Sequence, residues 1–120
     1  MEGWLAAFLF TELVESPLYF LALRRSEGGT IYKIVAALGP SALTHPVVWF
    51  VAPPLVGAWC PYQADVCFWI ALIASEAFAI LVEWVYLAAL GVRRAWMWTL
   101  VANVASAGLG WLLRWLVGWP

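Results

Sequence analysis

The chain has 120 residues, of which 66% are hydrophobic and 11% charged, and its mean hydropathy is +0.90. Soluble domains carry about a quarter charged residues, because a small globule must keep a large surface hydrated. The composition therefore argues against a water-soluble domain, and a net charge of −1 without a basic stretch argues against a nucleic-acid partner. We expect an all-α integral membrane protein whose main partner is the lipid bilayer and whose residues 1–120 form a single transmembrane domain.

The apolar stretches predict a bundle of four transmembrane helices joined by short loops. A spanning helix needs about 20 apolar residues. Four stretches meet this length, and the predicted spans cover residues 4–23, 31–51, 66–90 and 95–117. The first span ends at Arg24-Arg25, and the third ends at Gly91, shortly before Arg93-Arg94.

The second span contains two prolines, Pro40 and Pro46. Proline lacks an amide hydrogen and leaves the carbonyl four residues earlier without its helical partner. We therefore expect a proline-broken second helix that stops before Pro53-Pro54. Freed carbonyls inside a membrane must be satisfied by side chains, water or an ion.

Lys and Arg are distributed unevenly between the two ends of the predicted bundle. The loops after the first and third spans hold Arg24-Arg25 and Arg93-Arg94, whereas the central loop holds no basic residue. Because cytoplasmic loops are enriched in Lys and Arg, we predict that these two turns are cytoplasmic. Both termini and the central loop are then on the outer side, and only Arg114 argues against this orientation.

The two cysteines, Cys60 and Cys67, lie in or beside the predicted outer loop. Disulfides persist on the oxidising side of a membrane, and an even cysteine count there favours a Cys60–Cys67 disulfide. The alternative is two unpaired, apolar residues at a span end.

The first and third spans share a short sequence pattern. Leu13-Val14-Glu15, followed by Tyr19, is echoed by Leu81-Val82-Glu83, followed by Tyr86. The pattern predicts a tandem 2+2 helix repeat, with halves related by an axis along the membrane normal. The spacing slips by one residue between the copies, and span composition alone can also produce such a match.

Polar residues within the predicted spans form the candidate site. Ionisable side chains at this depth are costly, and they normally face the protein interior or a water-filled cavity. Counted from the arginine ends at the rise of a helix, they fall into two layers, about 12–15 Å and about 18–22 Å deep. The first layer holds Glu15, Glu83 and Asn103, the second holds Glu12, His45 and Glu76, and the candidate site also includes Tyr19, Thr44 and Tyr86.

Three interpretations of these residues compete. Stacked Glu and His residues can relay protons or bind a cation along a pathway. Alternatively, Glu12, Glu15, His45 and Glu76 could hold a divalent metal ion as a cofactor, because carboxylates with one His suit a first-row transition metal. Finally, the carboxyl groups could be hydrogen-bonded groups that hold the helices in register.

We expect a small membrane transporter or channel that passes protons or metal cations through a Glu/His-lined bundle. No nucleotide-binding loop, nucleophile–base pair or HExxH motif is present, so an enzyme is the less favoured expectation. A bundle of 120 residues is thin for a complete pathway, which favours a homo-oligomer. The alternative is a non-catalytic membrane subunit or assembly factor of a larger complex.

Overall fold

The computed structural model describes residues 2–118, and these residues form helices and turns only. The predicted location of the two chain ends concerns Met1, Trp119 and Pro120, which lie outside the described residues. The helices, in chain order, are α1 (Glu2–Leu23), α2 (Thr30–Phe50), α3 (Ala52–Trp59), α4 (Ala64–Ala89) and α5 (Ala95–Val117).

Four helical segments are long and apolar enough to cross a membrane, which confirms the predicted number of helices. They are Gly3–Leu23, Thr30–Trp59, Ala64–Ala89 and Ala95–Val117. The second of them joins α2 and α3 into one segment of 30 residues. That length exceeds the roughly 20 residues needed to span the hydrocarbon core.

The interruption in the second segment lies beyond its two internal prolines, not at them. Helix α2 continues through Pro40 and Pro46 to Phe50, so the expected break at these prolines is not seen. The chain turns at Val51 (φ −109°, ψ −49°), and α3 begins at Ala52. Helix α2 ends at Phe50, before Pro53-Pro54 as predicted. A new helix follows instead of a loop, and these prolines occupy the first turn of α3, where their missing amide hydrogens are not needed.

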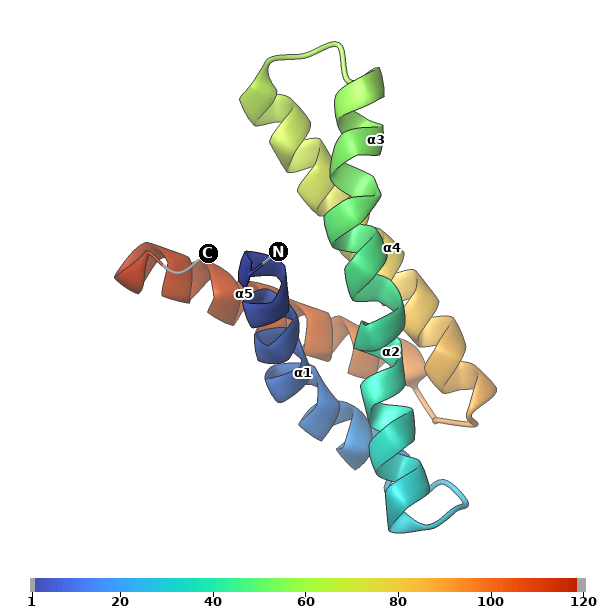
Figure 1. Ribbon diagram of the computed structural model, residues 1–120. Coiled ribbons are helices and arrows are strands. Elements are labelled where there is room, and N and C mark those ends of the chain that lie inside the picture. The colour runs from blue at the N-terminus through green and yellow to red at the C-terminus, as the bar shows by residue number, and fades with distance from the viewer. Residues whose placement is uncertain (1, 119–120) are drawn as a thin grey trace.

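The helices form a four-membered ring. Helix α1 packs against α2 and α5, helix α4 packs against the same two helices, and α3 lies beside α4. Helices α1 and α4 are therefore diagonal to each other, as are α2 and α5. Figure 1 shows that α3 and the N-terminal half of α4 extend away from α1 and from the C-terminal half of α5.

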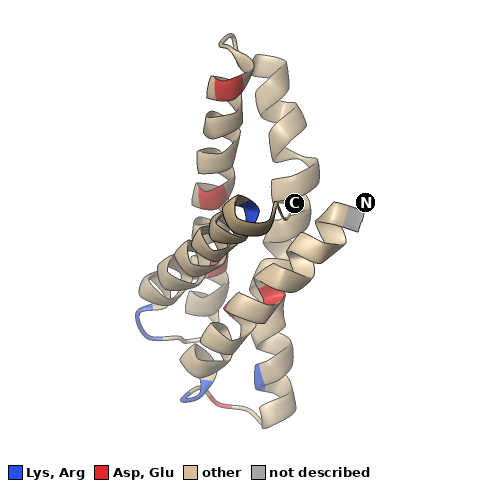
Figure 2. Cartoon of the chain, turned by 90° about the vertical axis from the view of Figure 1, so that its left-hand side faces the viewer, with Lys and Arg blue, Asp and Glu red and all other residues tan. Residues whose placement is uncertain are grey.

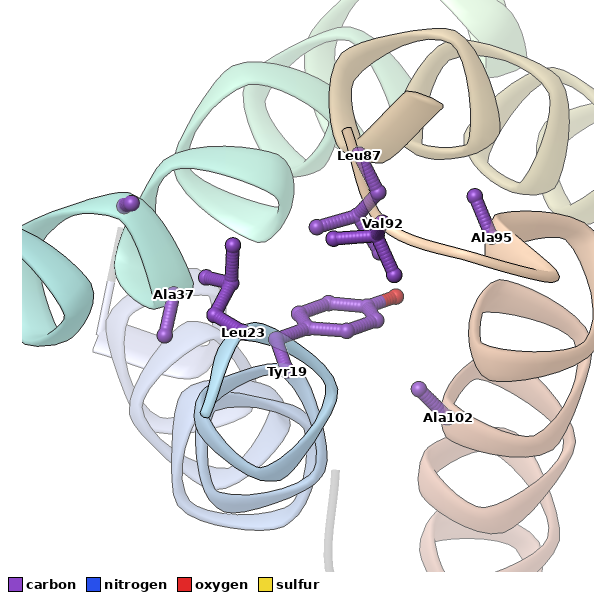
Figure 3. Packing of buried hydrophobic residues seen from close by; sticks show 8 residues of the cluster. Tyr19, Leu23, Ala37, Leu87, Val92, Ala95 and Ala102 are labelled. Carbon is purple, nitrogen blue, oxygen red and sulfur yellow. The ribbon is translucent and has the colours of Figure 1, made fainter. Parts of the chain in front are cut away.

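A small hydrophobic cluster closes one end of the ring. Its largest members, Tyr19, Leu23 and Leu87, are fully buried. Val92 and Ala95 bring the arginine-bearing turn between α4 and α5 into the same cluster, and Figure 3 shows the Tyr19 ring reaching from α1 toward this turn. The cluster comprises Tyr19, Leu23, Ala36, Ala37, Leu87, Val92, Ala95 and Ala102.

Most other large apolar side chains face outward. Leu13 is 74% exposed and Ile31 is 79% exposed. A water-soluble monomer rarely exposes so much contiguous apolar surface, whereas lipid solvates such side chains well. The fold therefore suggests a membrane location for the chain.

Basic side chains and the disulfide bond lie at opposite ends of the bundle. Figure 2 shows the Lys and Arg residues of the α1–α2 and α4–α5 turns gathered at one end, with a further basic residue near the end of α5. At the far end, Cys60 and Cys67 are joined by a disulfide with a Cα–Cα distance of 5.8 Å. The two ends therefore differ in charge and in cysteine chemistry.

The contact between α2 and α4 depends on a glycine. A Cβ atom added to Gly39 would lie 2.2 Å from the Tyr86 hydroxyl oxygen, whereas one added to Gly108 in α5 would meet nothing within 4 Å. Alanine otherwise favours a helix interior over glycine by about 1 kcal/mol. We expect Gly39→Ala to lower the free energy of unfolding by about 1–3 kcal/mol, and Gly108→Ala to leave it unchanged or raise it. Thermal unfolding of both variants in detergent measures this difference, and equal effects would contradict the proposed contact.

Candidate functional site: two buried carboxyl groups beside a cavity

Glu83 of α4 accepts hydrogen bonds from the three other long helices. The Thr44 hydroxyl of α2 donates to Oε1 at 2.7 Å, and the Asn103 amide of α5 donates to Oε2 at 2.7 Å. The Tyr19 hydroxyl of α1 also donates to Oε2. Glu83 is only 1% exposed, so these donors replace the water that would otherwise solvate the carboxyl group.

Glu15 of α1 is bound in a similar way by two serines. The Ser41 hydroxyl of α2 donates to Oε2 at 2.5 Å, and the Ser106 hydroxyl of α5 donates to Oε1. Glu15 is 2% exposed. Each of the two diagonal helices therefore places one carboxyl group inside the ring, and both carboxyl groups take donors from the same two neighbours, α2 and α5.

No cation accompanies these carboxyl groups. No Lys or Arg in the described part of the chain forms an ion pair with Glu15 or Glu83, and all of their donors are neutral hydroxyl or amide groups. Burying an unpaired charge is expensive. A carboxyl group buried among neutral donors alone is therefore stabilised by carrying a proton or by a cation bound beside it.

Both carboxyl groups lie at a cavity of about 390 Å³. Along α4 its lining runs from Phe68 to Glu83, a length of roughly 22 Å at the rise of a helix. Phe68 and Pro53 line it toward the disulfide end, and Glu83 and Asn103 line it toward the hydrophobic cluster. The other polar residues in its lining are Thr11, Glu15, Thr44, His45, Ser75, Glu76, Ser106 and Arg114.

His45 lies in the cavity wall within a group of aromatic rings. Its ring is stacked with Trp49 at a centroid distance of 5.9 Å and meets Phe8 edge-on at 5.3 Å. Trp4 completes the group at 6.1 Å. His45 is 7% exposed, and its Nδ1 atom has no hydrogen-bond partner.

Glu12 does not join the other candidate residues. Its Oε2 atom accepts a hydrogen bond from Ser16 one turn later, and its Oε1 atom has no partner. It lines a separate groove between α1 and α2, with Leu13, Pro17 and other apolar side chains. The second predicted layer is therefore divided, with His45 and Glu76 at the cavity and Glu12 outside it.

Tyr86 also lies away from the two carboxyl groups. It is packed against Gly39 of α2, and no hydrogen bond within the described residues joins it to Glu15. Tyr19, its counterpart in the predicted repeat, is fully buried and bonded to Glu83. The two tyrosines therefore play different roles, and the tandem repeat stays a prediction.

The predicted metal ligands are not assembled in the described part of the chain. No group of three or more His, Cys, Asp or Glu residues there is arranged to hold a metal ion. Of the residues considered as ligands, Glu15, His45 and Glu76 share the cavity, whereas Glu12 faces the separate groove. The arrangement is better suited to holding protons than to coordinating a divalent ion.

One contributor to the site, Ser41, is absent from the predicted residues. Its hydroxyl donates to Glu15, as does that of Ser106, a residue whose place beside Asn103 on the small-residue face of the fourth span predicts a hydrogen bond inside the bundle. Ser41 lies three residues before Thr44 and four before His45, so it shares their helix face. That spacing is the signal that could have identified it.

Comparisons with protein-family models, curated proteins and solved structures find no match to this chain. Fold and site alone therefore define its class: a small helical protein with four potential membrane spans and a pair of buried carboxyl groups beside an internal cavity.

The hydrogen bond that the Thr44 hydroxyl donates to Glu83 should contribute measurably to the free energy of unfolding. Thr44→Val keeps the shape of the side chain but removes the hydroxyl that donates to Glu83, and a buried acceptor that loses its donor costs about 1–3 kcal/mol. Thr11→Val is the matched control, because Thr11 lines the same cavity and no hydrogen bond involves its side chain. Unfolding in detergent should show a loss of stability for Thr44→Val alone. Equal losses in both variants would contradict the role of this hydrogen bond.

Proposed function

We propose that this chain is an integral membrane carrier that moves protons or small cations, with Glu15 and Glu83 as the binding groups. The observation that carries the proposal is the burial of two carboxyl groups beside a cavity, with no Lys or Arg paired to either one. Ionisable groups at such depth commonly mark ion or proton pathways in membrane proteins. A proton is the cargo that this site accommodates most directly, since no metal-ligand group exists among the described residues.

A carrier fits this geometry better than an open channel. The cavity reaches the carboxyl groups from the disulfide side, whereas the cluster around Tyr19, Leu23 and Leu87 closes the arginine side. Transport then requires the cluster to part as the cavity closes. Alternating access of this kind is how secondary transporters move cargo past a site near the bilayer midplane.

The proposed orientation places the arginine-bearing turns in the cytoplasm and the Cys60–Cys67 disulfide outside. The supporting observations are the basic residues at one end of the bundle and the disulfide at the other. Positively charged loops stay inside, and disulfides persist in oxidising compartments. In this orientation the cavity faces the outer side of the membrane.

Single-cysteine labelling tests the orientation. Replacing Cys60 and Cys67 with serine leaves no cysteine in the chain, and Glu27→Cys or Gln63→Cys then places one thiol in either loop. In intact cells, a membrane-impermeant maleimide should label the chain at position 63 and should label it at position 27 only after lysis. The reverse pattern would invert the proposed orientation.

A second candidate is a non-catalytic subunit or assembly factor of a larger membrane complex. One observation favours it: all four oxygens of Glu15 and Glu83 already have hydrogen-bond donors within the chain. Interhelical hydrogen bonds of this kind can serve packing alone. In that role the exposed apolar faces would bind helices of partner subunits. In a carrier the same faces would contact lipid or other copies of this chain.

Flux measurements in proteoliposomes decide between the two candidates. We expect the wild-type chain to carry protons under an imposed potential, and we expect Glu15→Gln, Glu83→Gln and the double variant to abolish this flux. Glutamine keeps the size of the side chain and its capacity to accept a hydrogen bond but cannot exchange a proton. Glu12→Gln is the matched control, because Glu12 lies one turn away on the same helix but outside the cavity.

Full flux in Glu12→Gln together with no flux in correctly folded Glu83→Gln supports the carrier. Absence of flux for protons, monovalent cations and divalent cations in the wild type, with the glutamine variants merely less stable, would overturn it. That result would favour the packing role.

A further inference from the structure

The cavity is larger and more apolar than a proton or a bare ion requires. Its volume of about 390 Å³ falls within the range of roughly 300–1,000 Å³ that is typical of small-molecule sites. Apolar and aromatic side chains make up the larger part of its lining, and the carboxyl groups of Glu15, Glu76 and Glu83 are among its polar members. Such sites hold organic molecules, whose frame contacts the apolar wall and whose polar group is oriented by the few hydrogen-bonding or charged residues.

Aromatic side chains form much of the wall. Each of the four long helices contributes one aromatic ring to it: Phe10 from α1, Trp49 from α2, Phe68 from α4 and Trp111 from α5. Trp111 is stacked on Trp69 with a centroid distance of 5.3 Å and an interplanar angle of 8°, which holds its ring in place. Aromatic faces attract cations, and flat rings pack well against them.

Two polar groups in the wall have unused hydrogen-bonding capacity. Glu76 lies seven residues, or two turns, before Glu83 on the same face of α4, and its side chain makes no hydrogen bond or ion pair with a described residue. His45 is 93% buried in the wall, and its Nδ1 atom has no hydrogen-bond partner among residues 2–118. Unlike the carboxyl groups of Glu15 and Glu83, these two side chains therefore have hydrogen-bonding capacity that no described residue uses.

The charges of the lining favour a positively charged ligand at the inner end. Glu15, Glu76 and Glu83 line the cavity, and Arg114 is the one basic residue among its lining residues. Arg114 lies eleven residues after Asn103 on α5, which places it roughly 16 Å further along the helix. Arg114 is also exposed, so solvent screens its charge more than the charges of the inner carboxyl groups.

We propose that the cavity binds an organic cation, a positively charged nitrogen on a flat aromatic frame, with Glu76 facing the charge and the aromatic wall holding the frame. This inference rests on the proposed carrier function and names the substrate class of the same site. The organic cation and a proton would compete for the negative charge of one of the three carboxyl groups in the cavity, those of Glu15, Glu76 and Glu83. Such competition is the coupling that an exchanger needs, because binding of one cargo disfavours binding of the other.

Binding of ethidium to the purified full-length chain in detergent tests the inference without requiring transport. Ethidium is a flat aromatic cation whose fluorescence rises when it leaves water. We expect saturable binding that weakens about tenfold or more in Glu76→Gln, since the half-buried carboxyl group that faces the ligand's charge is lost. Glu12→Gln should bind like the wild type, and tetramethylammonium, which lacks an aromatic frame, should not displace ethidium.

A second variant tests the aromatic wall separately. Trp111 is 43% exposed, so Trp111→Leu does not remove a fully buried side chain. We expect its affinity for ethidium to fall by about two- to thirtyfold, the range that corresponds to losing a cation–π contact. Circular dichroism and gel filtration establish that each variant is folded before its affinity is compared.

The outcomes separate this inference from the carrier proposal. Equal affinity for ethidium and for the anionic dye anilinonaphthalene sulfonate, or unchanged ethidium binding in both Glu76→Gln and Trp111→Leu, would overturn the inference. Proton flux that depends on Glu83, without any ethidium binding, would overturn it as well and leave the carrier intact. Ethidium binding without flux of any ion would support the site and contradict the carrier.

Discussion

The bundle depends on the hydrogen bonding of two buried carboxyl groups. Glu15 and Glu83 lie on diagonal helices, and all of their donors except Tyr19 of α1 come from the two helices between them. In lipid the hydrophobic effect does not draw apolar helices together, so interhelical hydrogen bonds and close packing must define their arrangement. The apolar cluster is small and lies at one end of the ring, which leaves these polar contacts as the main link in the middle of the bundle.

The same arrangement accounts for the cavity. Small side chains such as Ala102 let α5 approach α1 near the carboxyl groups, and a Cβ added to Gly110 would lie 3.8 Å from Phe10. Beyond that level α3 and the first half of α4 diverge from α1 and the second half of α5 (Figure 1), and aromatic rings contribute to the cavity lining. Carboxyl groups together with aromatic rings in one cavity suit a site that combines a charge with a flat apolar body.

The lack of a paired basic side chain at Glu15 and Glu83, among the described residues, is the feature that distinguishes the proposed carrier site from a purely packing role. Polar groups that only hold helices together are usually neutral, because a charged group without a partner costs several kcal/mol in a low-dielectric interior. Asn103, Thr44 and the two serines could fulfil that structural role without any glutamate. The presence of three carboxyl groups at one cavity is therefore the observation that most favours exchange of protons or cations, although their saturation with donors is what a packing role also predicts.

The sequence by itself determined the number and approximate limits of the four long helices, because the length and hydropathy of each segment depend only on local composition. It also identified Glu15, Glu83 and Asn103 as polar residues at similar depth, since the helical rise converts residue number into depth. Only the tertiary structure decided which side of a helix each polar group occupies, and so it separated Glu12 and Tyr86 from the site and added Ser41. It also moved the interruption of the second segment from the prolines to Val51. These features depend on how far each helix is rotated about its own axis and on which helices lie beside it. A sequence pattern within one segment specifies neither.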